Sequence, residues 1–173
     1  GTLARDIEFL EVAGNENNLV TPLLASVRLS NDEHKNWIRR KLVENFIDLK
    51  GITVAVWGLT YKPGTDTLRR SLAVELCDWL IEEEAVVKVY DPAVKQLPGR
   101  WTGHVHHKTN ALDAVAGADV LVIGTEWPEF RQISTDLMSV ATTNMIVIDA
   151  NRHIKQSVDK FGIQYLAVGI PLI

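Results

Sequence analysis

The sequence predicts an α/β protein with a mostly parallel sheet and flanking helices, preceded by one long helix. Short apolar runs alternate with helical patterns after residue 51, as in βαβ units. The runs VAVWG, VLVIG and MIVID are apolar almost throughout, which is typical of strands covered on both faces. A chain of 173 residues with 46% apolar residues is long enough to bury one core and a smaller element.

The first predicted element is a helix over residues 21–50. Thr21 is its candidate N-cap, Pro22 suits the first helical position, and Gly51 follows its end. Such a helix of about 28 residues would be about 40 Å long, which is more than one small domain needs. We therefore expect it to connect domains or to pair with a second chain. The alternative is a core helix with a solvated middle, because residues 31–36 are polar.

The alternating elements follow in order along the rest of the chain. They are strand 52–57, helix 71–84, strand 86–90, helix 110–116, strand 119–123, a short helix near 132–140, strand 144–148 and a last strand near 163–167.

Composition excludes several classes of function. The formal charge of −4 and a pI near 5.7 argue against nucleic acid and an anionic membrane as partners. The single cysteine, Cys77, excludes an intrachain disulfide, and no apolar run reaches the length of a membrane span, so a cytoplasmic location is expected. Cys77 lies on the apolar stripe of its helix, which predicts an inert buried thiol. His104, His106 and His107 lack a carboxylate or cysteine partner, so no metal site is predicted.

Ligands of open α/β sheets bind outside the carboxyl ends of the strands. The segment after the first strand, residues 58–71, begins like a phosphate turn, yet the second and third glycines of G-x-G-x-x-G do not follow Gly58. This long loop contains three cations, Lys62, Arg69 and Arg70, which favours an anionic ligand. An ordinary solvated loop is the alternative. Polar segments at 91–92, 124–127 and 149–152 follow the other strands.

Several segments carry a resemblance to a known family. The run GLTYKPGTDTLRRSLAVEL resembles the segment GLAFKPxTDDxRESPAxxL of the UDP-glucose/GDP-mannose dehydrogenase family. VYDPAV, TEWPEF and VIDANR resemble that family's YDP, TEWxxF and DGRN segments in the same order. Upstream, TPLLASVRLSNDEHK resembles TPLLxAVxxxNxxQ, at the start of the family's central dimerisation helix. The likeness spans nearly the whole chain.

The resemblance implies a central helical region at residues 1–50 and a Rossmann-like, C-terminal nucleotide-sugar-binding domain at residues 51–173. It implies a homodimer through the long helix and a nucleotide sugar as ligand. NAD would be bound mainly by an N-terminal domain that this sequence, which begins at Gly1, does not include. Lys62 matches the family's substrate-contacting lysine, and Arg69 matches an arginine on the NAD side of the cleft.

The first residues align with the family's catalytic segment G-x-C-L-P-K-D. Thr2 stands where the family has the cysteine that forms a thioester, Arg5 replaces a lysine associated with NAD, and Asp6 matches an aspartate that assists catalysis. A hydroxyl is a far poorer nucleophile than a thiolate, so this departure removes support for the thioester step. A cloning change at the terminus, an engineered or natural loss of the nucleophile, and a diverged paralogue would each explain it.

Two functions from different classes follow from these residues. The first is part of an NAD-dependent nucleotide-sugar 6-dehydrogenase, which oxidises the C6 alcohol of the sugar to a carboxylate; the chain alone is expected to be inactive. The second is a diverged nucleotide-sugar-binding and dimerisation module. Thr2 favours the second, as does Ile170, which stands where many members of the family have an arginine of the nucleotide site.

Overall fold

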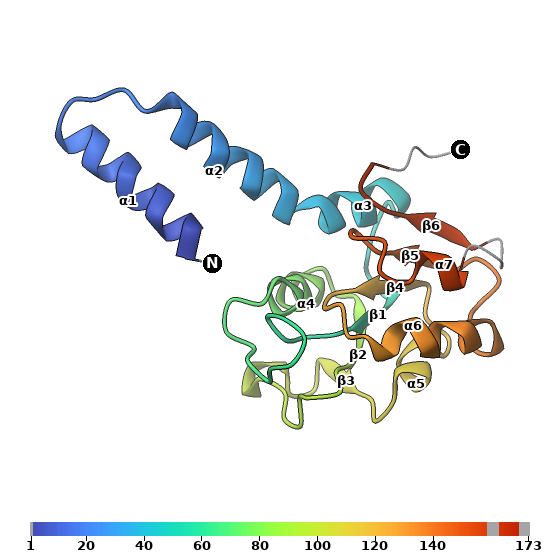
Figure 1. The fold of residues 1–173 in the computed structure, drawn as a ribbon. Helices are drawn as coiled ribbons and strands as arrows, with labels where there is room; N and C mark the ends of the chain where they lie inside the picture. Colours follow the sequence, from blue (N-terminus) through green and yellow to red (C-terminus); the bar gives the residue numbers. More distant parts are fainter. Residues whose placement is uncertain (1, 159–162, 170–173) are drawn as a thin grey trace. The chain divides into compact units, whose positions relative to one another are not determined.

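The computed structural model describes residues 2–158 and 163–169 (Figure 1). The chain forms two compact units, Gly1–Arg40 and Lys41–Ile173, and each is described by itself. The division into functional domains after residue 50 stays a prediction.

The first unit is built around a pair of contacting helices, α1 (Thr2–Glu16) and α2 (Pro22–Lys35). Helix α1 was not predicted. Its C-terminal end closes through a hydrogen bond from the Leu19 amide to the Gly14 carbonyl, at 2.8 Å. Gly14 lies against the following turn, because an added Cβ there would come within 2.7 Å of the Thr21 methyl group. An ion pair of 2.9 Å between Arg28 and Glu11 joins the two helices.

The single helix predicted over residues 21–50 is wrong in its extent. Two helices occupy this range, α2 and α3 (Trp37–Asn45), with Asn36 in a turn between them. The interruption falls on Asn36 alone, which is exposed, and asparagine is a weak helix former. Helix α3 ends at Asn45, earlier than predicted, and in the segment that follows Asp48 accepts a local hydrogen bond from the Lys50 amide.

The second unit contains a parallel sheet, as predicted, but with six strands where five were predicted. Its strand order is β3-β2-β1-β4-β5-β6, in which β1 lies between β2 and β4. The strands are β1 (Thr53–Trp57), β2 (Val86–Tyr90), β3 (Val105–His107), β4 (Val120–Ile123), β5 (Ile146–Ile148) and β6 (Gln164–Leu166). The short strand β3 was not predicted as an element.

Short helices connect the strands, and two of them are capped by side chains, whereas Thr21, the predicted N-cap of α2, forms no side-chain cap hydrogen bond. The helices are α4 (Leu72–Glu82), α5 (Ala111–Val115), α6 (Glu129–Ile133) and α7 (Lys155–Val158), with 3₁₀ turns at Gly99–Trp101 and Ser134–Ser139. Ser71 caps α4 by accepting from the Val74 amide, and Asn110 caps α5 in the same way from Asp113. The helix predicted near 132–140 is divided between α6 and the second 3₁₀ turn.

Alternating residues of β1 face the two sides of the sheet. Ala55 and Trp57 belong to a buried cluster with residues of α5, α6 and α7. Val56 faces the other side of the sheet, toward α4. A Cβ added at Gly124 would lie within 3.3 Å of both the Val56 side chain and Ala73 of α4. Helices therefore cover both faces, which is why these strands are apolar throughout.

Candidate functional site

The strand order places a topological switch point between β1 and β4, where α/β sheets most often bind nucleotides. Here the protein itself fills the space between the two turns. Gly58 has a φ of +87°, and a Cβ there would lie 2.6 Å from the Thr125 amide nitrogen. A Cβ at Gly124 would lie 2.5 Å from the Gly58 carbonyl oxygen. The two turns are thus in backbone contact, and glycine is required on both sides of it.

A buried carboxylate, Asp91 at the end of β2, joins three of the turns at this edge. Its Oδ2 accepts from the backbone amides of Leu59 at 2.7 Å and Thr60 at 3.1 Å, and from the Thr60 hydroxyl at 3.3 Å. The same oxygen accepts from the Trp127 indole at 3.1 Å. Its Oδ1 accepts from two amides of its own turn, at residues 93 and 94. Asp91 is 3% exposed, so these donors replace the water it would otherwise bind.

A second set of hydrogen bonds joins the turn after β4 to the turns after β1 and β5. The Thr125 hydroxyl donates to the Thr60 carbonyl at 2.5 Å, and the Asn151 amide donates to Glu126. Asp149, buried at the end of β5, accepts from the Ile154 amide and the Tyr165 hydroxyl. These bonds make the carboxyl edge a connected polar layer above an apolar core.

The His153 ring contacts this layer through a single bond. Its Nε2 lies 2.9 Å from the Trp127 carbonyl, and its buried Nδ1 has no hydrogen-bond partner among the described residues.

The three cations of the loop after β1 project from this layer into solvent. Lys62, Arg69 and Arg70 are exposed, and within residues 2–158 and 163–169 none of them forms an ion pair or a hydrogen bond through its side chain. The loop is closed at its base by a bond from the Tyr61 amide to the Thr67 carbonyl, at 2.8 Å. The structure thus presents Lys62 and Arg69 on one loop with their charges available to an anion.

The predicted catalytic residues lie in the other unit. Arg5 and Asp6 are exposed on α1, and Thr2 begins that helix, although its side chain lies outside the described part of the chain. Ile170 also lies outside the described residues.

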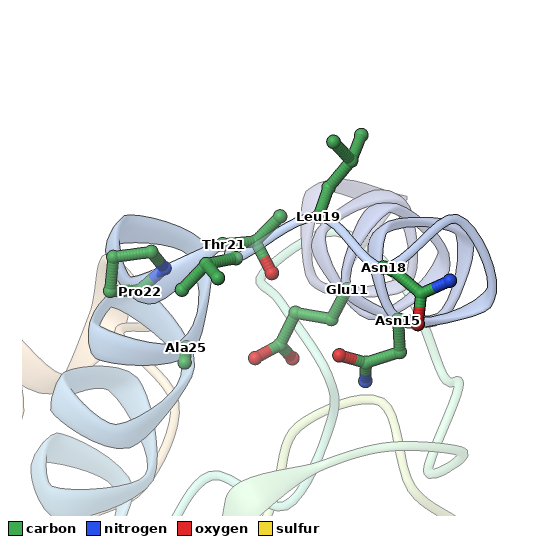
Figure 2. A pocket seen from close by; sticks show the side chains of 8 residues that line it. Glu11, Asn15, Asn18, Leu19, Thr21, Pro22 and Ala25 are labelled. Atoms are coloured by element: carbon green, nitrogen blue, oxygen red, sulfur yellow. The ribbon is translucent and has the colours of Figure 1, made fainter.

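Two cavities lie along the helix pair of the first unit. One, of about 530 Å³, has Glu11 and Asn15 of α1 on one side and Pro22 and Ala25 of α2 on the other (Figure 2). The second, of about 390 Å³, is lined by Leu3, Ala4, Ile7, Glu8, Val27, Arg28, Asn31, Asp32 and Lys35. Neither Arg5 nor Asp6 lines either of these cavities.

Cys77 and the histidines, the other residues considered from the sequence, do not form a reactive or metal-binding site among the described residues. Cys77 is fully buried, and burial raises the pKa of its thiol well above the ordinary value, as expected for an inert cysteine. His106 and His107 are exposed on β3, and the described residues contain no cluster of three metal-ligating side chains. Among the helices that the structure describes, none combines the length and the apolar character that crossing a bilayer requires.

Sequence reasoning identified the loop but not the carboxylate that holds it. Asp91 was noted only as part of a polar segment after a strand. The sequence feature that could have identified Asp91 is an acidic residue directly after β2. The turn after β1 has too few glycines to bind a phosphate through its backbone, so its amides need another acceptor. Its partners in the other turns lie more than 30 residues away along the chain, so only the tertiary structure shows them.

The fold and the loop agree with comparisons to known proteins. Residues 55–156 match the model of the UDP-glucose/GDP-mannose dehydrogenase family, UDP binding domain. The match covers more than half of the chain, and the chain belongs to this family.

Individual relatives have the same character. The chain is 36% identical over 143 residues to a UDP-glucose 6-dehydrogenase of Rhizobium meliloti, covering 82% of this chain and 33% of that protein. It is 34% identical over 125 residues to a UDP-glucose 6-dehydrogenase of Rickettsia conorii, covering 70% of this chain and 29% of that protein. It thus spans about a third of the length of these relatives.

A solved structure supports the fold. The UDP-glucose dehydrogenase of the hyperthermophilic archaeon Pyrobaculum islandicum superimposes with a TM-score of 0.75 at 24% identity, covering 94% of this chain and 35% of that one.

Proposed function

We propose that this chain is the C-terminal part of an NAD-dependent nucleotide-sugar 6-dehydrogenase and that its second unit binds the nucleotide sugar. The complete enzyme would oxidise the C6 alcohol of a UDP-glucose-like substrate to a carboxylate. The observation that carries the proposal is the loop of residues 58–71. It combines the family's sequence with exposed, unpaired cations at the carboxyl edge of the sheet. A diphosphate is the ligand that such cations recognise.

Residue roles follow the family resemblance. Lys62 would contact the nucleotide sugar, whereas Arg69 and Arg5 would face NAD, and Asp6 would assist catalysis. The structure supports this division only in that all four side chains are exposed and therefore accessible to ligands.

The β1 turn does not fit the pyrophosphate of NAD. In a dinucleotide-binding turn, backbone amides bind the phosphates, yet here the amides of Leu59 and Thr60 already donate to Asp91. The Gly58 and Gly124 turns also leave no space between them. We therefore assign the main NAD site to a part of the enzyme outside this chain, and we expect the chain alone to reduce no NAD.

The second candidate is a diverged nucleotide-sugar-binding and dimerisation module. Thr2 at the family's cysteine position favours it, because a hydroxyl without a dedicated base does not form the acyl intermediate readily. Turnover by the complete protein decides between the two. Formation of NADH from UDP-glucose supports the enzyme, and binding of UDP-glucose without NADH formation supports the module.

We also propose a homodimer and a cytoplasmic location. Large exposed apolar side chains are frequent on α1 and α2, and burying them against a second copy would remove them from water. They are Leu3, Phe9, Leu10, Val12, Leu23, Val27 and Leu29. Phe9→Asp combined with Leu29→Asp should therefore convert a dimer to a 19.3 kDa monomer in sedimentation. Ile47→Asp, at an exposed position of the second unit, is the control; a monomeric wild type contradicts the proposal.

Titration calorimetry with UDP-glucose tests the binding site. Lys62→Ala should weaken binding several-fold and reduce its dependence on salt, because one charged contact is lost. Arg70→Ala is the matched control, since it removes the same charge from the same loop. Arg70 has a φ of +61°, which arginine and alanine tolerate equally because both carry a Cβ. Equal effects of the two substitutions would contradict a specific role for Lys62.

A further inference from the structure

The backbone amides of the turn after β1 need hydrogen-bond acceptors. A turn of this kind ordinarily offers them to a phosphate, but Gly58 is followed by leucine and threonine. The structure shows that one oxygen of Asp91 receives the Leu59 and Thr60 amides together with the Thr60 hydroxyl. A protein carboxylate thus occupies the place of an anionic ligand.

We propose that Asp91 is a positioning residue for nucleotide-sugar binding, acting as a built-in anion that holds the Lys62 loop in its binding conformation. This inference rests on the proposed function, since it assigns Asp91 to the same site. Asp91 does not reach the ligand itself, because it is 3% exposed and its oxygens already accept six hydrogen bonds. It acts through Thr60.

Thr60 is the point at which the loop is attached to the sheet. Its amide and hydroxyl donate to Asp91, and its carbonyl accepts from the Thr125 hydroxyl at 2.5 Å. All polar atoms of this residue are therefore fixed from β2 and β4. Lys62 follows two residues later.

Beyond Thr60 the loop has few restraints. The Tyr61 amide bonds to the Thr67 carbonyl, and Thr65 accepts from the Thr67 amide, so both of these bonds lie within the loop. The far end is anchored by Ser71, the N-cap of α4. The hydrogen bonds at Leu59 and Thr60 are the ones nearest to Lys62 that tie the loop to other strands. Three of these four bonds are accepted by Asp91.

Asp91 also connects this loop to the turn after β4. Its Oδ2 accepts from the Trp127 indole, while Trp127 receives the His153 ring on its carbonyl. No cation pairs with Asp91 among the described residues, so neutral donors alone hold it. Replacing the carboxylate with an amide brings an NH₂ group against these donors and breaks the set on one side.

The test is a double-substitution cycle on UDP-glucose affinity with this chain. Asp91→Asn should weaken binding several-fold and by no more than Lys62→Ala does, because it acts by displacing Lys62. If Asp91 acts by placing Lys62, then Lys62→Ala should cost much less in the Asp91→Asn background than in the wild type. A purely structural role predicts that the two effects add.

Asp149→Asn is the matched control. Asp149 is a buried carboxylate at the end of strand β5 and accepts from an amide and a hydroxyl, but its partners do not belong to the Lys62 loop. It should lower stability without changing UDP-glucose affinity. If Asp91→Asn does not fold, Thr60→Val removes one donor to Asp91 while keeping the side-chain shape. It should give a smaller weakening that is coupled to Lys62 in the same way.

The outcomes separate the two proposals. No binding by the wild type overturns the proposed function, and the positioning role falls with it. Binding by the wild type with unchanged affinity in the Asp91 variant, or with additive effects of Asp91 and Lys62, overturns the positioning role alone. Equal weakening by Asp149→Asn also overturns it.

Discussion

Gly58→Ala should destabilise the second unit more than an ordinary glycine substitution. Gly58 has a φ of +87°, and placing a Cβ in the left-handed region costs about 1–2 kcal/mol. The added carbon would also lie 2.6 Å from the Thr125 Cβ, nitrogen and oxygen, whereas carbon contacts are ordinarily about 3.5–4.0 Å. Overpacking of this kind costs about 1–3 kcal/mol, so the total is about 2–5 kcal/mol.

Gly64→Ala separates the two contributions. Gly64 has a similar φ of +78°, but nothing lies within 4 Å of an added Cβ. It should therefore lose only the backbone part, about 1–2 kcal/mol. The difference between the two variants measures the contact of the β1 and β4 turns.

Urea unfolding followed by tryptophan fluorescence provides the assay, because Trp57 and Trp101 are buried in the second unit. The midpoint for Gly58→Ala should lie clearly below that for Gly64→Ala at an unchanged slope. Equal midpoints would refute the close approach of the two turns.

Two further predictions concern groups away from the site. A hydrogen bond from Arg100 lowers the pKa of Asp78, so its contribution to stability is present above the unfolded-state pKa near 3.8 and is lost as pH falls through the lower native pKa. The destabilisation caused by Asp78→Asn should therefore be seen at pH 7 and shrink below pH 4 in thermal unfolding; a constant difference would contradict it. Cys77 should resist thiol reagents in the native protein and react at the rate of unfolding in urea, because it is 0% exposed and burial raises its pKa; fast native labelling would disprove this.

The chain's local patterns were sufficient to predict the sheet. Strands covered on both faces need continuous apolar residues. A run such as residues 54–57 can therefore be predicted as a buried strand from its own sequence alone. The helices predicted from residues 71 and 110 begin there, and Ser71 and Asn110 cap them. The cationic loop was also visible, since its charges and its position after a strand are properties of the sequence.

Three elements differ from the sequence-based prediction: the helix over residues 21–50, helix α1 and strand β3. The polar residues 31–35 still belong to helix α2, and the predicted helix is interrupted at Asn36, an exposed residue, before α3 begins at Trp37. Helix α1 was not predicted from the sequence. Strand β3 is only three residues long, and its histidines are exposed, so it lacks the apolar signal of the central strands.

The sequence by itself determined the fold class, five of the six strands in their order and the presence of a cationic loop after the first strand. Only the tertiary structure decided what the β1 turn holds. Asp91 meets Leu59, Thr60 and Trp127 because parallel strands bring their carboxyl ends to one edge. A hydrogen bond between residues more than 30 positions apart leaves no periodic pattern in the chain, since it depends on strand order and register, which burial of the whole sheet fixes.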